Sequence, residues 1–261
     1  MKSNYRYIVK AFMAMAVIAG TTSCDDFLDR EPMSSISPET YYSTAAQLEA
    51  NLNDEYPNVL PSFGQWTYGI FGEDKGTDNQ IEVNANDRYT QDRWKVPHSE
   101  SDNWKFERIY RINFFLSEAL PKFGEDMSGS QNTISGSVAT IKHYIGEMYF
   151  LRAYEYFKKL QLFGDFPIIN QPLADEMEAL REASKRFPRN EVARFIISDL
   201  DKAYAYMSDV DMATTRINKD AAMLVKSRVA LFEATWLQNF KGTAFVPLSL
   251  IHISEPTRLR R

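Results

Sequence analysis

The stretch from residue 138 to residue 163 most constrains what this chain can fold into. Apolar side chains recur along it every three or four residues, and no proline interrupts it. This spacing is typical of one long amphipathic helix, and Gly164 follows where many helices end in a residue with positive φ. Such a helix must bury its stripe against another element. The expected stripe is Val138, Ile141, Ile145, Met148, Tyr149, Tyr156 and Leu160.

Four further segments carry helical periodicity, with their own start and stop signals. Thr44 and Gln47 form a capping-box pattern at the start of the first. Pro57 is expected to end the first helix and Pro121 the second, because proline lacks the backbone N–H that a helix needs. Asn218 is a suitable N-cap for the last. The five expected helices span about 44–56, 101–120, 138–163, a stretch after Pro188, and about 218–236.

The segments between these helices complete the predicted fold class. Residues 166–169, with the sequence FPII, are expected to be a short extended segment. Residues 58–100 are rich in Gly, Asn and Asp without any sustained period, so we expect a long irregular loop region, which in a compact domain is commonly functional. The prediction is an all-α fold of helical hairpins in a degenerate repeat, with this loop region attached.

The N-terminus has the layout of a bacterial lipoprotein signal. Basic residues precede an apolar run at 11–20, and small residues then lead to Cys24, the only cysteine of the chain. The run is too short to span a membrane. We expect residues 1–23 to be a signal peptide and Cys24 to be lipidated, because several acyl chains anchor a protein stably. A free buried thiol is the alternative, which the acidic residues after Cys24 disfavour.

Composition excludes several classes of function. The formal net charge is −5 although both ends of the chain are basic, and the sequence contains no basic stripe. Nucleic acids are strongly anionic, so we expect no nucleic-acid partner. The three histidines form no zinc-protease motif, and neither of the glycine-rich phosphate-binding motifs is present. We therefore expect no cofactor, no metal and no catalytic residue.

The last residues, LSLIHISEPTRLRR at 248–261, differ in character from the preceding chain. Back-translation of LSLIHISEPTR gives a transposon mosaic end joined to a sequencing adapter. We interpret residues 248–261 as a translated library artefact and residues 24–247 as the N-terminal domain of a longer chain. The alternative is a genuine basic strand at the C-terminus.

Five segments together resemble the SusD/RagB family. They are CDDFLDREP, WKFERIYRINFFL, YFLRAYEYFKKLQLFGDFPII, PRNEVARFIISDLDKA and NKDAAMLVKSRVALFEA, and the similarity covers residues 24–247. The resemblance implies tetratricopeptide-like helical hairpins on the outer membrane of Bacteroidetes, in a lipid-anchored protein that faces the cell exterior. It implies glycan or other nutrient binding without catalysis, and delivery to a SusC-like TonB-dependent transporter.

The loop region supplies the candidate ligand-binding residues. Sugars offer apolar faces for aromatic stacking and hydroxyl groups for planar polar side chains, and Trp94 before Pro97 is the best candidate platform. Trp104 is expected to pack in the core instead. The full candidate set is Asp74, Asp78, Asn79, Arg88, Arg93 and Trp94.

Three alternatives remain open. Asp74, Asp78 and Asn79 have oxygen atoms that suit calcium, but their spacing differs from that of an EF-hand loop. Glu73 and Asp74 are two carboxylates, yet a glycosidase needs them about 5–10 Å apart across a cleft. A helical-repeat scaffold that binds a protein partner is the alternative function.

Overall fold

The computed structural model describes residues 41–61, 103–124, 126–208 and 215–246. The chain divides into two compact units, Met1–Tyr41 and Tyr42–Arg261, and all the described helices belong to the second. The described residues contain helices and isolated bridges but no strand, which confirms the all-α fold class. The helices are α4 (Ala45–Val59), α5 (Glu107–Phe123), α6 (Val138–Phe163), α7 (Met177–Ala183), α8 (Arg189–Tyr206) and α9 (Lys219–Asn239).

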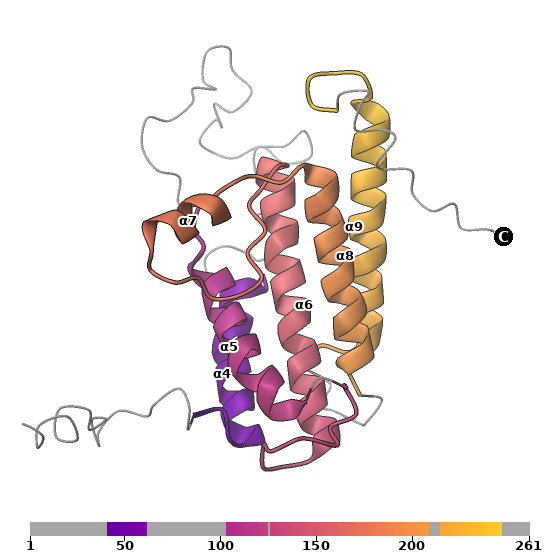
Figure 1. Cartoon of the computed structure of the whole chain (residues 1–261). Coiled ribbons are helices and arrows are strands. Elements are labelled where there is room, and N and C mark those ends of the chain that lie inside the picture. Colours follow the sequence, from indigo (N-terminus) through magenta and orange to yellow (C-terminus); the bar gives the residue numbers. More distant parts are fainter. Residues whose placement is uncertain (1–40, 62–102, 125, 209–214, 247–261) are drawn as a thin grey trace, which may run out of the picture. The chain divides into compact units, whose positions relative to one another are not determined.

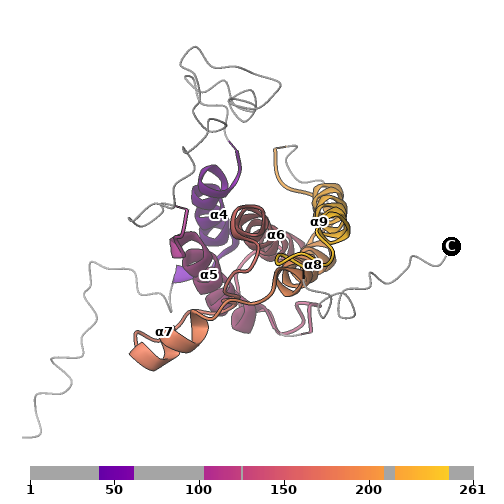
Figure 2. The ribbon, with the colours of Figure 1, turned by 90° about the horizontal axis from the view of Figure 1, so that it is seen from above.

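Helix α6 lies at the centre of this unit. It packs against α4 and α5 on one side and against α8 on the other, while α9 packs on α8 (Figures 1 and 2). Only the short α7 stands off to the side of this array. Almost every residue from Ile141 to Leu160 is buried, so α6 is covered all round. None of the described helices is long and apolar enough to cross a membrane.

Helices α6 and α8 approach each other very closely. A Cβ atom added at Gly146 would lie 2.9 Å from the carbonyl oxygen of Ala203 and 2.9 Å from the amide nitrogen of Met207. Ala203 is fully buried at this interface. Small side chains therefore set the distance between the two helices.

Several predicted helix boundaries are confirmed. Helix α6 spans the predicted 138–163, and Gly164 follows it with φ of 70°. Thr44 and Gln47 make both hydrogen bonds of the capping box, and the Asn218 side chain accepts from the amide of Ala221 at 2.9 Å. These caps satisfy amides that a first helical turn leaves without partners.

The two proline stops were wrong. Pro57 lies inside α4, which continues to Val59, and Pro121 lies inside α5, which continues to Phe123. Val59 and Phe123 are both fully buried. Burying such a side chain contributes about 1.5–3 kcal/mol, which is comparable to the cost of about 3 kcal/mol for a proline within a helix.

Two further differences concern α5 and α7. Helix α5 begins at Glu107 rather than near residue 101, and Trp104 precedes it. The Trp104 ring packs edge-on against Phe163 and Phe166, each with a centroid distance of 4.8 Å. It is only half-buried, so it packs at the edge of the core rather than within it. Helix α7 was not predicted.

Candidate functional site

All sequence-predicted site residues lie outside the described part of the chain. This holds for the lipidation site, Cys24, and for the predicted loop ligands Asp74, Asp78, Asn79, Arg88, Arg93 and Trp94. They remain predictions. Among the described residues, no group of three or more His, Cys, Asp or Glu side chains is placed to hold a metal ion.

The extended segment after α6 is held in place by buried polar groups. The Tyr156 hydroxyl donates to the carbonyl of Ile169 at 3.0 Å and accepts from its amide at 2.8 Å. Asn113 of α5 also donates to the Ile169 carbonyl, at 2.9 Å. Arg152 donates to the carbonyl of Asn170 at 3.1 Å. Residues 169–170 are therefore fixed to α5 and α6, and two cavities lie beside them.

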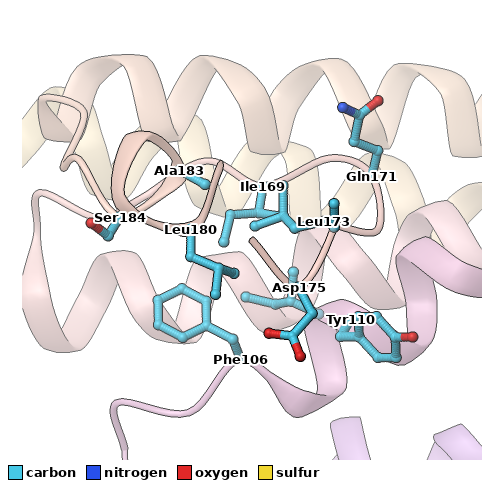
Figure 3. A pocket seen from close by; sticks show the side chains of 11 residues that line it. Phe106, Tyr110, Ile169, Gln171, Leu173, Asp175, Leu180, Ala183 and Ser184 are labelled. Atoms are coloured by element: carbon cyan, nitrogen blue, oxygen red, sulfur yellow. The ribbon is translucent and has the colours of Figure 1, made fainter. Parts of the chain in front are cut away.

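The first cavity, which we call the apolar cavity, has a volume of about 370 Å³ and lies between α5, residues 169–175 and α7 (Figure 3). Side chains from all three elements converge on it, with Phe106 and Leu180 close together in the view. Asp175 is the only charged residue in its lining. The lining residues are Phe106, Ile109, Tyr110, Ile169, Gln171, Leu173, Ala174, Asp175, Leu180, Ala183 and Ser184.

The α7 side of the apolar cavity is thinly covered. No residue of α7 is buried, and Met177 is 82% exposed. Tyr110, on the opposite wall, is 52% exposed. Exposed apolar side chains around a hollow can take the apolar face of a ligand.

The second cavity, which we call the polar cavity, has a volume of about 320 Å³ and lies between α5, α6 and α8 beside residues 170–171. It combines apolar and aromatic walls with amide, hydroxyl and cationic groups. Its lining residues are Asn113, Leu116, Ser117, Leu120, Pro121, Tyr149, Arg152, Asn170, Gln171, Phe195 and Lys202.

A buried ion pair forms the base of the polar cavity. Arg152 makes a two-pronged contact with Asp199, at 2.7 Å from Nε to Oδ2 and 2.8 Å from the second terminal nitrogen to Oδ1. Its other terminal nitrogen donates to Asn113 Oδ1 at 2.9 Å. Burial alone would lower the pKa of Arg152, but the hydrogen bonds to Asp199 raise it above its ordinary value. The guanidinium is therefore charged, and four hydrogen bonds to Asp199, Asn113 and Asn170 hold it in place.

The Tyr149 ring lies close to two cations. The Arg152 guanidinium carbon lies 5.2 Å from the centre of its ring, and Lys202 Nζ lies 5.3 Å from that centre. Burial raises the pKa of Tyr149 to about 12, so its hydroxyl is protonated at neutral pH and can donate a hydrogen bond.

Sequence reasoning missed the residues that form these cavities. One signal was present, since Asn113 is a polar residue within the apolar stripe of α5, between Ile112 and Phe114. A buried polar residue in such a place needs a polar partner, and here the partners are Arg152 and the Ile169 carbonyl. Nothing in the sequence indicates that Lys202 and Gln171 line the same cavity.

A family of SusD-like proteins described as "Starch-binding associating with outer membrane" matches residues 26–231. Two relatives from Formosa agariphila are similar over most of the chain. SusD-like protein P25 is 25% identical over 82% of this chain and 41% of its own length. SusD-like protein P2 is 25% identical over 92% of this chain and 46% of its own length.

A solved structure gives a consistent fold. A SusD-like carbohydrate binding protein from Bacteroides fragilis is 18% identical, with a TM-score of 0.50 over 76% of this chain and 39% of that one. The chain thus spans less than half the length of these relatives. Since the family match covers most of the sequence, and the helical fold agrees with it, this chain belongs to the SusD-like family.

Proposed function

We propose that this protein is a lipid-anchored protein of the outer membrane that binds glycan at the cell exterior and delivers it to a SusC-like TonB-dependent transporter. The observation that supports it is the family match over residues 26–231, with its description as starch-binding and outer-membrane-associated. The proposal concerns the whole protein. Anchoring through Cys24 follows from the lipoprotein signal in the sequence.

The described helices supply a rigid frame for such a binding protein. Binding sites are commonly loops carried on a packed scaffold, and α6 is buried along nearly its whole length. We propose that Trp94 stacks on a sugar ring, while Arg93, Arg88 and the group Asp74, Asp78 and Asn79 bind its hydroxyls. No step of this mechanism breaks a bond in the glycan, so the protein captures the ligand and releases it unchanged.

Tryptophan fluorescence tests glycan binding directly. We expect maltoheptaose, a soluble starch fragment, to change the emission of the wild-type chain in a saturable manner, because a sugar on Trp94 excludes water from the ring. Trp94→Ala should abolish the change. Trp236→Phe is the matched control, since Trp236 lies on α9 against Arg189, with 4.0 Å between the guanidinium carbon and the ring centre. It should lower the total emission and leave the response intact.

Membrane attachment and transporter partnership need separate experiments. Cys24→Ser should release the protein from the membrane fraction of cells that express it, because no acyl chain can then be attached. A transporter partner should be isolated together with the wild-type protein from solubilised outer membranes. Attachment unchanged by Cys24→Ser would contradict the anchoring proposal.

A helical scaffold for a protein partner is the second candidate function. It is favoured by the outer face of α9, where Met223, Leu224 and Leu231 are 46%, 72% and 66% exposed. An enzyme would be recognised by new reducing ends released from starch. A release rate that Glu73→Gln abolishes would contradict the non-catalytic proposal, and a wild-type chain whose fluorescence no saccharide changes would favour the scaffold.

A further inference from the structure

We propose that the polar cavity binds a single sugar unit that carries an anionic group, either a carboxylate or a sulfate ester. The inference rests on the proposed glycan-binding function and adds a class of ligand and a second place of contact. This place is lined by residues of α5, α6 and α8 and by residues 170–171, and none of them is among the loop ligands predicted from the sequence.

The charge of the lining is the first argument. Two cations and no carboxylate line the polar cavity. The charge of Arg152 is balanced by Asp199, through their two-pronged contact. Lys202 has no carboxylate partner among the described residues, because the neighbouring Asp201 pairs with Lys226 instead. The cavity therefore carries one positive charge without a counter-ion from the described chain, which attracts an anion.

The hydrogen-bonding groups are the second argument. The Tyr149 hydroxyl and the Gln171 carboxamide make no hydrogen bond within the described structure. The Ser117 hydroxyl donates to the carbonyl of Phe114 at 2.9 Å, which leaves its oxygen able to accept. A sugar presents several hydroxyls that both donate and accept, so it can satisfy groups of both kinds at once.

The shape and packing of the cavity are the third argument. Its volume of about 320 Å³ is at the lower end of the range of roughly 300–1,000 Å³ for ligand sites, which suits one ring. Phe195, Leu116 and Leu120 offer an apolar wall for the C–H face of that ring. Asn113 and Arg152 already make their internal hydrogen bonds, so the base keeps its geometry without a ligand.

The apolar cavity provides a contrast within the same molecule. It has a similar volume but a single charged lining residue, the carboxylate of Asp175. Asp175 has no partner within the described chain. A negative charge disfavours an anionic ligand there, so an anionic sugar should select the polar cavity.

Calorimetric titration of the whole chain with three monosaccharides tests the inference. Glucuronate and glucose 6-sulfate carry the two anionic groups, and glucose is the neutral reference. We expect at least one of the anions to bind on the order of tenfold more tightly than glucose, because a hydrogen bond between charged groups is stronger than a neutral one. Whichever of the two anionic sugars binds more tightly identifies the anionic group, a carboxylate or a sulfate ester. Equal affinity for all three sugars would overturn the inference.

Two variants with a control locate the binding. Lys202→Met removes the charge but keeps an apolar stem, and it should reduce the anion's affinity to that of glucose. Gln171→Glu adds a carboxylate to the exposed rim of the cavity. It should lower the affinity for the anionic sugar and leave the affinity for glucose unchanged. Lys142→Met is the matched control, because Lys142 is also half-buried and without an ion pair among the described residues. Anion binding that survives both cavity variants unchanged would overturn the inference.

Parallel titration with maltoheptaose separates this inference from the proposed function. Maltoheptaose binding that depends on Trp94, without any preference for the anionic sugars, would leave the proposed function standing and refute the polar cavity as an anionic-sugar site. Anion binding that depends on Lys202, without a maltoheptaose response, would support the cavity and contradict starch-type binding by the loop residues.

Discussion

At the α6–α8 interface the side chains of Arg152 and Asp199 are only 3% and 1% exposed, whereas the α7 segment (residues 175–187) contains no buried residue at all. Residues of both regions line a cavity. They differ in the contacts that hold them. The interface combines close backbone approach at Gly146 with a buried ion pair, while α7 is held by few side-chain contacts.

This difference indicates that the two cavities have different mechanical properties. Local opening of a protein costs least where few apolar contacts and many exposed hydrogen bonds are found. The base of the polar cavity is buried and hydrogen-bonded, so we expect it to open rarely. The apolar cavity has one wall, α7, without a buried residue, so we expect this wall to open more readily than the α6–α8 interface.

The largest effect is expected from breaking the ion pair. Arg152→Ala should lower the free energy of unfolding by about 3–5 kcal/mol, because it leaves the Asp199 charge buried without a partner. Urea denaturation followed by circular dichroism measures this. The double variant Arg152→Met with Asp199→Leu should recover much of the loss, since it removes both charges together. A loss below about 1 kcal/mol for the single variant would contradict the assigned burial.

The next effect comes from the close contact at Gly146. Gly146→Ala should destabilise the protein by about 1–3 kcal/mol, because the added Cβ would overpack against backbone atoms of Ala203 and Met207. Elsewhere in a helix the same substitution stabilises by up to about 1 kcal/mol. The sign of the change in the free energy of unfolding, measured by the same urea experiment, therefore tests the close contact. A more stable variant would show that α6 and α8 can separate.

A smaller loss is expected from Tyr156→Phe, which tests how the extended segment is attached. The variant removes both hydrogen bonds to Ile169 and should cost about 1–2 kcal/mol. Tyr154→Phe is the control on the same helix, because the Tyr154 hydroxyl makes no hydrogen bond within the described residues, and it should change stability little. Equal effects of the two variants would mean that Ile169 finds other partners.

The fold was more predictable than the site, for reasons visible in particular residues. Helix α6 has an unbroken apolar period, and local caps at Thr44 and Asn218 mark the starts of α4 and α9. The proline stops were wrong because burial of Val59 and Phe123, a property of the tertiary structure, offsets the local cost of a proline within a helix. Helix α7 was missed because its sequence, MEALREA, is too short to show a period, although all seven residues are strong helix formers.

The cavities were not predictable because their walls come from distant parts of the chain. Ser117, Tyr149, Gln171 and Lys202 lie on four different segments of the chain, and no spacing rule relates them. Periodicity identifies which face of a helix is buried but not which partner helix meets it or at what register. Tyr156 illustrates this, since its place in the apolar stripe indicates a buried ring but not that its hydroxyl binds the Ile169 carbonyl.

The smallest effect is expected at α7, the exposed counterpart of the buried α6–α8 interface. Lys185 pairs with Glu182 at 2.5 Å, but the two side chains are 66% and 58% exposed. Because water screens such a pair, Lys185→Ala should change the free energy of unfolding by less than about 0.5 kcal/mol. Hydrogen exchange should show the same contrast without any substitution, with the amides of α7 exchanging long before those of α6. If the amides of α7 were protected as well as those of α6, the segment would be part of the rigid frame, and the apolar cavity would then be as fixed as the polar one.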